Sequence, residues 1–120
     1  MLLDEQGDDI IAIDRDEVDI TVGDEVMALF TKVRPEVVYH LAGQADVGGS
    51  WSSPVETFRI NAEGTMNVLL AAVRADLEAA LAEGIKAVAI VFMHAYRHPA
   101  HERAVATLAR DMGFAQVSVS

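Results

Sequence analysis

Residues that could hold a ligand follow the short apolar segments of this 120-residue sequence. Asp14 comes directly after the β-branched run DIIAI, Asp19 and Ile20 lie at the end of the next short run, and LAG (41–43) closes a third. Open α/β sheets bind ligands at the carboxyl ends of their strands. If the three runs are strands of one parallel sheet, these residues lie at its ligand-binding edge.

A second group consists of His94, His98 and His101, followed by Glu102. Imidazole nitrogens are common zinc ligands, so these three side chains could share a metal ion. Their spacing matches no recognised zinc motif, whereas Pro99 and Glu102 suit the first turn of a helix. We therefore expect a helix start and no metal ion, with the three-histidine site as the alternative.

The composition is that of an acidic, folded protein. Hydrophobic residues make up 52% of the chain and the net charge is −10. That charge disfavours nucleic acid and anionic membranes as partners, because both attract Lys and Arg. The sequence has no cysteine, no apolar run of the roughly 18 residues needed to span a membrane, and no basic region at its N-terminus. We expect a single cytoplasmic domain, residues 1–120.

Hydrophobic periodicity predicts strands that alternate with helices. Apolar runs predict strands at 9–13, 18–21, 36–41, 85–93 and 116–120, and helical spacing predicts helices at 24–34, 54–83 and 99–112. The helix at 54–83 is longer than most, so a break near residues 75–76 is one option. Such alternation produces parallel sheets through right-handed crossovers. The expected fold is α/β: a three-layer α/β/α sandwich, Rossmann-like or flavodoxin-like, with a mostly parallel sheet of four to five strands.

The stretch PEVVYHLAGQADVGGSWSSPVETFRINAEGTMNVLLAAVRA, residues 35–75, carries a resemblance that covers about residues 1–75. It resembles the middle of an extended short-chain dehydrogenase/reductase of the NAD-dependent nucleotide-sugar epimerase/dehydratase kind. The resemblance implies that Asp14 binds the adenosine ribose and that Asn61 is the helix asparagine of a catalytic tetrad. The cofactor-binding residues that it implies are Asp14, Asp19, Ile20, Leu41, Ala42 and Gly43.

Two parts that this family requires are missing from the sequence. Its first strand and glycine-rich turn, which place a pyrophosphate on a helix N-terminus, have no counterpart, since Gly48 and Gly49 lie in a different context. Neither Tyr39 nor Tyr96 has a lysine four residues later, so the family's general acid/base cannot be built. We therefore expect no catalytic residues and no enzyme. Any surviving activity would be a remnant of an NAD-dependent epimerase/dehydratase.

The sequence AVAIVFMHAYRHPAHE and the helix after it carry a second resemblance, over about residues 76–120. They resemble an internal segment of the hydantoinase/5-oxoprolinase A-subunit family, without that family's phosphate-binding and metal-associated motifs. Two unrelated families meeting inside one helix indicate a chimera, engineered or accidental, whose parts complete one domain.

The expected function is accordingly that of a non-catalytic folded domain without a cofactor. Weak residual binding of NAD or another adenine nucleotide is the alternative. The C-terminal helix and strand have suitable lengths to fill the place of the missing first strand. A strand at the far edge of the sheet is a second option, and exchange of segments between two chains, which makes a homodimer, is a third.

Overall fold

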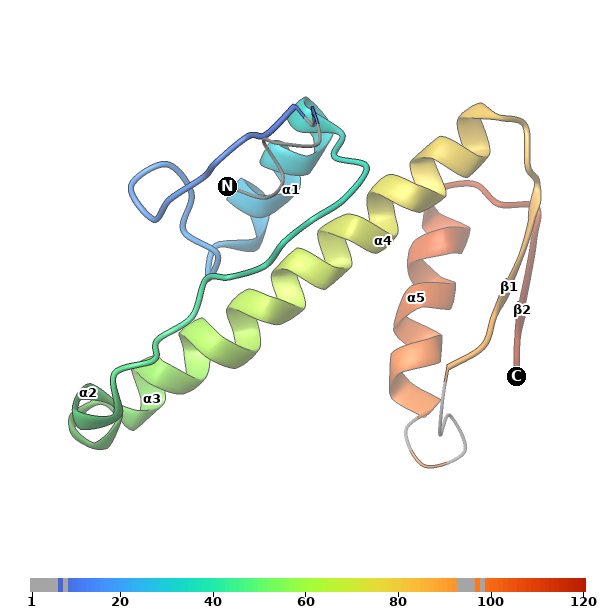
Figure 1. Ribbon diagram of the computed structural model, residues 1–120. Coiled ribbons are helices and arrows are strands. Elements are labelled where there is room, and N and C mark those ends of the chain that lie inside the picture. Colours follow the sequence, from blue (N-terminus) through green and yellow to red (C-terminus); the bar gives the residue numbers. More distant parts are fainter. Residues whose placement is uncertain (1–6, 8, 93–96, 98) are drawn as a thin grey trace. The chain divides into compact units, whose positions relative to one another are not determined.

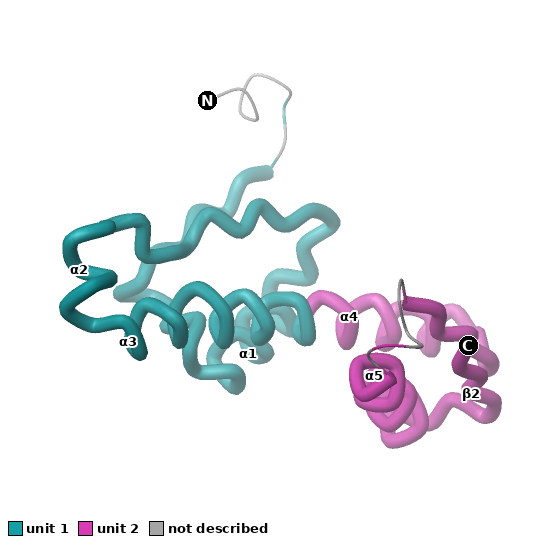
Figure 2. The backbone as a smooth tube through the Cα atoms, turned by 90° about the horizontal axis from the view of Figure 1, so that it is seen from below, with its two compact units in different colours: residues 1–71 teal, residues 72–120 magenta. Residues whose placement is uncertain are grey.

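The structure is a computed structural model that describes residues 7, 9–92, 97 and 99–120. The chain divides into two compact units, residues 1–71 (unit 1) and 72–120 (unit 2) (Figures 1 and 2). The boundary lies inside one helix, α4 (Gly64–Ala82). Whether the whole chain acts as a single domain, with a family junction near residue 75, stays a prediction. Among the described helices, none is long and apolar enough to cross a membrane.

In the described part of unit 1, open chain precedes α1 (Gly23–Val33), and a second long stretch of open chain follows it (Figure 1). Val26 and Phe30, one turn apart on α1, are its buried side chains. The helix ends where Arg34 adopts a left-handed conformation (φ 49°), and its N–H donates to the carbonyl of Phe30. Pro35 follows and cannot continue a helix. The predicted helix at 24–34 is therefore present, shifted by one residue.

The predicted long helix is present in three pieces: α3 (Pro54–Phe58), a π-helical turn η2 (Arg59–Glu63) and α4 (Gly64–Ala82). The irregularity lies at η2, so a break near residues 75–76 is wrong. A further short helix, α2 (Val47–Ser52), occupies part of the loop between the predicted strand at 36–41 and α3. Its N-terminus is capped by Asp46, as described below.

The sheet is smaller than the sequence predicts. Among the described residues only β1 (Ala87–Ile90) and β2 (Gln116–Val119) pair, in a parallel register from Ala87 opposite Gln116 to Ile90 opposite Val119. Residues 19–22 form a turn that is closed by a hydrogen bond from the Val22 N–H to the Asp19 carbonyl, so the strand predicted at 18–21 is absent. Residues 9–13 and 38–41 follow an open course without a paired strand, and residues 36–37 form a bend. The difference has a simple reason: an apolar run favours an extended backbone, but a strand also needs a neighbour for its main-chain hydrogen bonds.

Unit 2 is a compact βα arrangement. The second half of α4 leads to β1, and α5 (Pro99–Asp111) connects β1 to the parallel strand β2 (Figure 1). Two adjoining clusters form its core, with Val73, Val88 and Val117 packed against both. The buried members are Leu77, Ile90, Val105, Ala106, Ala109 and Phe114. This part of the structure matches the predicted order of helix, strand, helix and strand.

Candidate functional site

The residues that the family resemblance implies for cofactor binding lie in unit 1, at the ends of its two open segments. Asp14 forms a tight turn: its Oδ1 accepts from the Asp16 N–H at 2.9 Å, and its carbonyl accepts from the Val18 N–H at 3.1 Å. The side chain is exposed. One carboxylate oxygen thus shapes the local turn, as Asp side chains often do.

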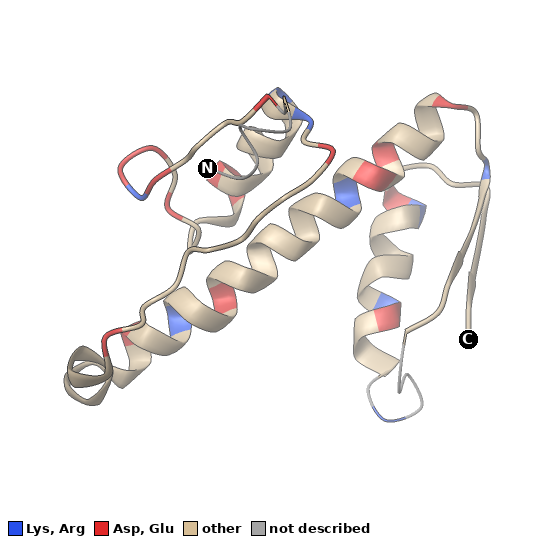
Figure 3. Ribbon diagram, viewed as in Figure 1, with Lys and Arg blue, Asp and Glu red and all other residues tan. Residues whose placement is uncertain are grey.

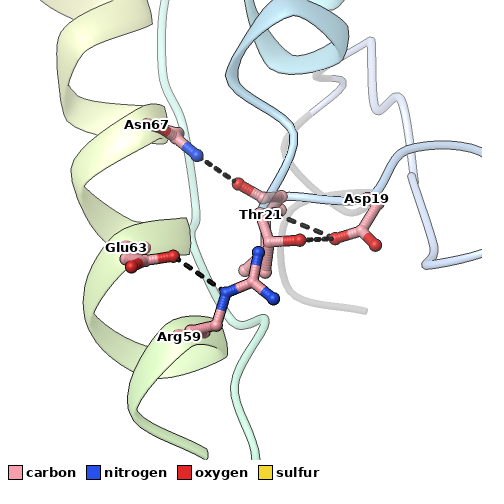
Figure 4. A network of polar contacts seen from close by, with 6 residues as sticks. Asp19, Thr21, Arg59, Glu63 and Asn67 are labelled. Atoms are coloured by element: carbon pink, nitrogen blue, oxygen red, sulfur yellow. Dashed lines mark hydrogen bonds and ion pairs between the residues drawn. The ribbon is translucent and has the colours of Figure 1, made fainter. Parts of the chain in front are cut away.

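Asp19 is held in a second turn by the residue two positions later. Its Oδ1 accepts from both the hydroxyl of Thr21, at 2.7 Å, and the Thr21 N–H, at 2.9 Å (Figure 4). The Thr21 hydroxyl, followed by its N–H, holds the pKa of Asp19 below its usual range, with smaller contributions from Arg15 and Arg59. These hydrogen bonds favour the charged carboxylate.

Ile20, between these two residues, joins the turn to α4. Its carbonyl accepts from Asn67 Nδ2 at 2.8 Å (Figure 4). Its side chain covers Gly64, where an added Cβ would lie 2.5 Å from Ile20 Cδ1. Only a residue without a side chain permits this approach, so Gly64 sets the distance between the turn and the helix. Asp19 and Ile20 are therefore positioned by Thr21, Asn67 and Gly64.

The segment Leu41, Ala42 and Gly43 is fixed at its end by Asn61. The Gln44 N–H donates to Asn61 Oδ1 at 2.7 Å, and Asn61 Nδ2 donates to the Gln44 carbonyl at 3.1 Å. Both polar atoms of the Asn61 amide are thus used on one main-chain unit. Leu41, in contrast, is 90% exposed.

A further contact holds the same segment one turn along the helix. His40 Nε2 lies 3.0 Å from Thr65 Oγ1, and the Thr65 hydroxyl donates to the Asn61 carbonyl at 2.7 Å. The family pattern marks Asn61, but it does not mark Thr21, Thr65 and Asn67, which position the neighbouring segments. A signal for Thr21 was available in its spacing from Asp19, because Asp and Thr two residues apart are typical of a side-chain-stabilised turn.

The glycine pair does not provide a pyrophosphate anchor. The Gly48 N–H donates to Asp46 Oδ1 at 3.0 Å, and the Gly49 N–H donates to Asp46 Oδ2 at 2.9 Å. The first N–H groups of α2 are thus engaged by a carboxylate of the chain itself, where a phosphate would have to bind. Gly48 and Gly49 therefore offer no free N–H groups to a pyrophosphate.

An open depression lies between the start of α1 and the helix η2–α4 in unit 1. Its volume is about 410 Å³, and its lining residues are Thr21, Gly23, Phe58, Ala62, Glu63, Met66 and Asn67. Phe58 and Met66 are 64% and 49% exposed. Arg59 and Glu63 form an exposed ion pair of 3.2 Å beside it (Figure 4). The depression is shallow and holds no buried polar group, so it does not define a ligand.

The predicted histidine group can be described only in part. His94 and His98 lie outside the described residues, and His101 is an exposed residue of α5. Within the described part of the chain, no three His, Cys, Asp or Glu side chains are arranged to hold a metal ion. Both the metal alternative and the expected absence of a metal stay predictions.

Glu102 has a role that its position in a helix start did not reveal. Its side chain is only 3% exposed, and Oε1 accepts from the Phe92 N–H and from the Ser120 hydroxyl, both at 2.8 Å. Phe92 follows β1 and Ser120 follows β2, so one buried carboxylate on α5 joins the carboxyl ends of both strands. Its contacts are structural hydrogen bonds within unit 2.

Comparisons with known proteins identify both parts of the sequence. The chain is 50% identical over 48 residues to 5-oxoprolinase of Saccharomyces cerevisiae, and 48% identical over 44 residues to 5-oxoprolinase 1 of Arabidopsis thaliana. These matches cover 40% and 37% of the chain but only 4% of each relative, so the chain spans a small fraction of these proteins. No solved structure matches it. The second resemblance is thereby confirmed.

The first resemblance is confirmed as well. The profile of the NAD dependent epimerase/dehydratase family, whose fold is Rossmann-like α/β, matches residues 1–95. The match passes the junction expected near residue 75 and includes β1. It covers well over half of the sequence, and the chain therefore belongs to the NAD dependent epimerase/dehydratase family.

Proposed function

We propose that this chain is a non-catalytic, chimeric domain, in which an epimerase/dehydratase segment is joined to a segment similar to 5-oxoprolinase. The observation that supports this proposal most directly is the hydrogen bonding of Asn61. Both polar atoms of its side-chain amide bind the main chain of Gln44. An amide engaged in this way holds a loop. The lysine of the family's YxxxK pair has no counterpart, since Lys32 and Lys86 are the two lysines of the sequence and neither follows a tyrosine at that spacing.

The test is an assay of NAD-dependent turnover on nucleotide-sugar substrates, followed by the absorbance of NADH and by product chromatography. The expected rate equals that of a Lys32→Ala/Asn61→Ala double variant prepared in parallel, because neither side chain takes part in a reaction. NAD-dependent turnover that the double variant lacks, at unchanged far-ultraviolet circular dichroism, would overturn the proposal. An engineered origin is tested separately by sequencing the source DNA, where a natural continuous reading frame across residues 71–95 would contradict it.

Weak binding of an adenine nucleotide is the second candidate function. What favours it is the placement of Asp14 and of Leu41 at the ends of the two open segments, both exposed. The binding residues would be Asp14, Asp19, Ile20, Leu41, Ala42 and Gly43. Because Asp46 occupies the amide groups of α2, such a site would hold adenosine without a strong phosphate anchor.

This candidate is tested by amide chemical shifts of the full chain during titration with AMP and with NAD up to millimolar concentration. Saturable shifts at residues 14, 19–20 and 41–43 would support it, provided that Asp14→Asn removes them. Asp16→Asn is the matched control, since it removes a carboxylate two residues away in the same exposed turn. Shifts that survive Asp14→Asn, or no shifts at all, would exclude an Asp14-dependent site.

The sandwich with a mostly parallel sheet of four to five strands also stays a proposal. It is supported by family membership and by the apolar sequences of residues 9–13 and 36–41. It requires both segments to acquire strand partners.

A further inference from the structure

The two open segments of unit 1, residues 9–13 and 36–41, are apolar but uncovered. Their main-chain groups form no hydrogen bond with any described residue. Large side chains on both segments are between 41% and 90% exposed, and they are Ile10, Ile11, Ile13, Val37, Val38, Tyr39 and Leu41. β-Branched and aromatic residues of this kind are enriched in strands. Unpaired extended main chain with apolar side chains is a template for strand addition.

Each segment is fastened at its C-terminal end. The segment at 36–41 is fastened by the His40–Thr65 contact and by the bonds of Asn61 to Gln44 just beyond it. The segment at 9–13 leads directly into the turn built by Asp14. Preorganised main chain lowers the entropic cost of binding a partner strand.

The two segments also share a direction. In Figure 1 both run the same way, and α1 connects them by running in the opposite direction, as the helix does in a βαβ unit. The segments are not hydrogen-bonded to each other. An added strand could therefore pair with either segment, or with both, in one parallel register.

The charges around the segments indicate what kind of strand fits. Acidic residues lie at both ends of residues 9–13, most densely in the turn after residue 13, and Asp46 follows residues 36–41 (Figure 3). Before residues 36–41, Lys32 and Arg34 precede the single carboxylate of Glu36 in sequence, so the acidic surroundings are strongest around residues 9–13. These flanking carboxylates belong to Asp9, Asp14, Asp16, Glu17, Asp19, Glu36 and Asp46. Arg15, Lys32 and Arg34 are the basic residues close to them in sequence. A second copy of this chain would bring the same acidic flanks and its own net charge of −10, so like charges disfavour it.

We propose that unit 1 binds a single β-strand of another polypeptide, about five β-branched apolar residues long and flanked on both sides by Lys or Arg. The apolar strand side chains cover the exposed side chains of residues 9–13 and 36–41, and its main chain completes their hydrogen bonds, as in other cases of β-augmentation. The basic flanks face the carboxylates around the segments. This interaction needs neither catalysis nor a nucleotide, so it stands apart from the function proposed above.

The probe is a synthetic peptide, Lys-Lys-Val-Thr-Val-Ile-Val-Lys-Lys, titrated into the full chain. Hydrogen exchange of the protein amides reports where it binds, and calorimetry reports how tightly. The expected result is slower exchange at residues 9–13 and 36–41, with binding that weakens as salt is added. Two control peptides carry Glu in place of each Lys, or Pro in place of the central Val. We expect at least about tenfold weaker binding of the Glu peptide, a difference typical of electrostatic complementarity, and no slowed exchange with the Pro peptide.

A pair of charge variants tests the flanks on the protein side. The double variant Asp9→Lys/Glu36→Lys should bind the Lys peptide more weakly and the Glu peptide more tightly. The control variant Glu83→Lys/Asp111→Lys makes the same change in net charge on exposed residues of unit 2. It should alter the affinity for neither peptide. Equal affinities for both peptides, or no binding, would overturn the proposal.

Two other ways of covering residues 9–13 and 36–41 give distinct hydrogen-exchange results when no peptide is present. If the amides of both segments are already protected in dilute solution, another part of the chain covers them. If their protection grows with protein concentration together with a doubled mass in light scattering, a second copy covers them. Either result would overturn the assignment to a separate basic strand.

Discussion

Gly64 and Ile20 form a close contact whose energetics depend on single carbon atoms. An alanine Cβ at position 64 would lie 2.5 Å from Ile20 Cδ1 and 2.7 Å from Cγ1. Overpacking of this kind costs about 1–3 kcal/mol, while alanine gains about 1 kcal/mol of helix propensity over glycine. Gly64→Ala should therefore destabilise the chain by up to about 2 kcal/mol, the difference of these two effects, measured by urea unfolding.

A double-mutant cycle isolates the contact. In an Ile20→Ala background the two crowding atoms are gone, so Gly64→Ala should become neutral or stabilising, with a coupling energy of about 1 kcal/mol or more. Val55→Ala, an exposed change on α3, should add to Gly64→Ala without coupling. If Gly64→Ala lowers the free energy of unfolding equally with Ile20 and with Ala at position 20, the helix and the turn do not approach each other as described.

Asp19 makes a prediction about pH. Its pKa is lowered in the folded chain, chiefly by the Thr21 hydroxyl. A lowered folded pKa means that the stabilising contribution is present above the unfolded pKa, near 3.8, and is lost as the pH falls through the folded value. Thr21→Val should raise the pKa of Asp19 toward its usual value, as measured by carboxyl-carbon chemical shifts. Thr31→Val, which removes a hydroxyl bonded to the Met27 carbonyl, should leave it unchanged.

The residue scale also shows what a sequence can reveal about a site. Asp14, Asp19 and Asn61 were identifiable because each belongs to a family pattern. Their actual partners were not: the pairing of Asn61 with Gln44 joins residues 17 apart, and that of Asn67 with Ile20 joins residues 47 apart. Such contacts depend on how the helix is placed against the turns. Periodicity in the sequence does not specify that placement.

At the scale of elements, Glu102 links a helix to two strand ends. Glu102→Ala would leave the Phe92 N–H and the Ser120 hydroxyl without their acceptor, at a cost of about 2 kcal/mol for lost buried hydrogen bonds. Glu102→Gln keeps an acceptor oxygen and should cost about half as much or less. The readout is the exchange of the β1 and β2 amides, which should accelerate more in the Ala variant than in the Gln variant.

The control for Glu102→Ala is the same substitution at Glu78, which also lies on a helix of unit 2. Glu78 forms an ion pair of 2.9 Å with Arg74, but both side chains are more than two-fifths exposed. Exposed pairs at this spacing contribute only about 0.3–0.5 kcal/mol. Glu78→Ala should therefore have a much smaller effect than Glu102→Ala. Equal effects would mean that the buried carboxylate does not hold the strand ends together.

Elements differed in how well the sequence predicted them. The helices at 23–33 and 99–111 follow from local periodicity and were predicted to within one residue. The π-helical turn at Arg59–Glu63 was not, because RINAE contains neither proline nor glycine to mark it. The apolar runs at 9–13 and 36–41 were assigned as strands, but pairing requires a neighbour that no local pattern supplies. Within the run at 85–93, residues 87–90 form β1, since β2 provides that neighbour; residues 85–86 and 91–92 lie outside the strand, and residue 93 lies outside the described residues.

At the scale of the whole molecule, the two units differ in how much core each possesses. Among the described residues, unit 2 buries six hydrophobic side chains, whereas the longer unit 1 buries four, Val26, Phe30, Val68 and Ala71. Local stability follows the amount of buried apolar contact. We therefore expect native-state hydrogen exchange to show that unit 1 opens at a lower urea concentration than unit 2.

Two core substitutions test whether these openings are separate. Phe30→Ala and Phe114→Ala each remove a side chain that is 6% exposed, one in each unit, and each should cost about 3–5 kcal/mol locally. Phe30→Ala should accelerate the exchange of α1 amides and leave those of β1 and β2 unchanged, and Phe114→Ala should do the reverse. A single domain, as expected from the length of the sequence, would instead respond as one unit, with every slow amide shifted equally by either change. That outcome would contradict the division at residue 71 and would mean that the family segment and the 5-oxoprolinase-like segment share one cooperative core.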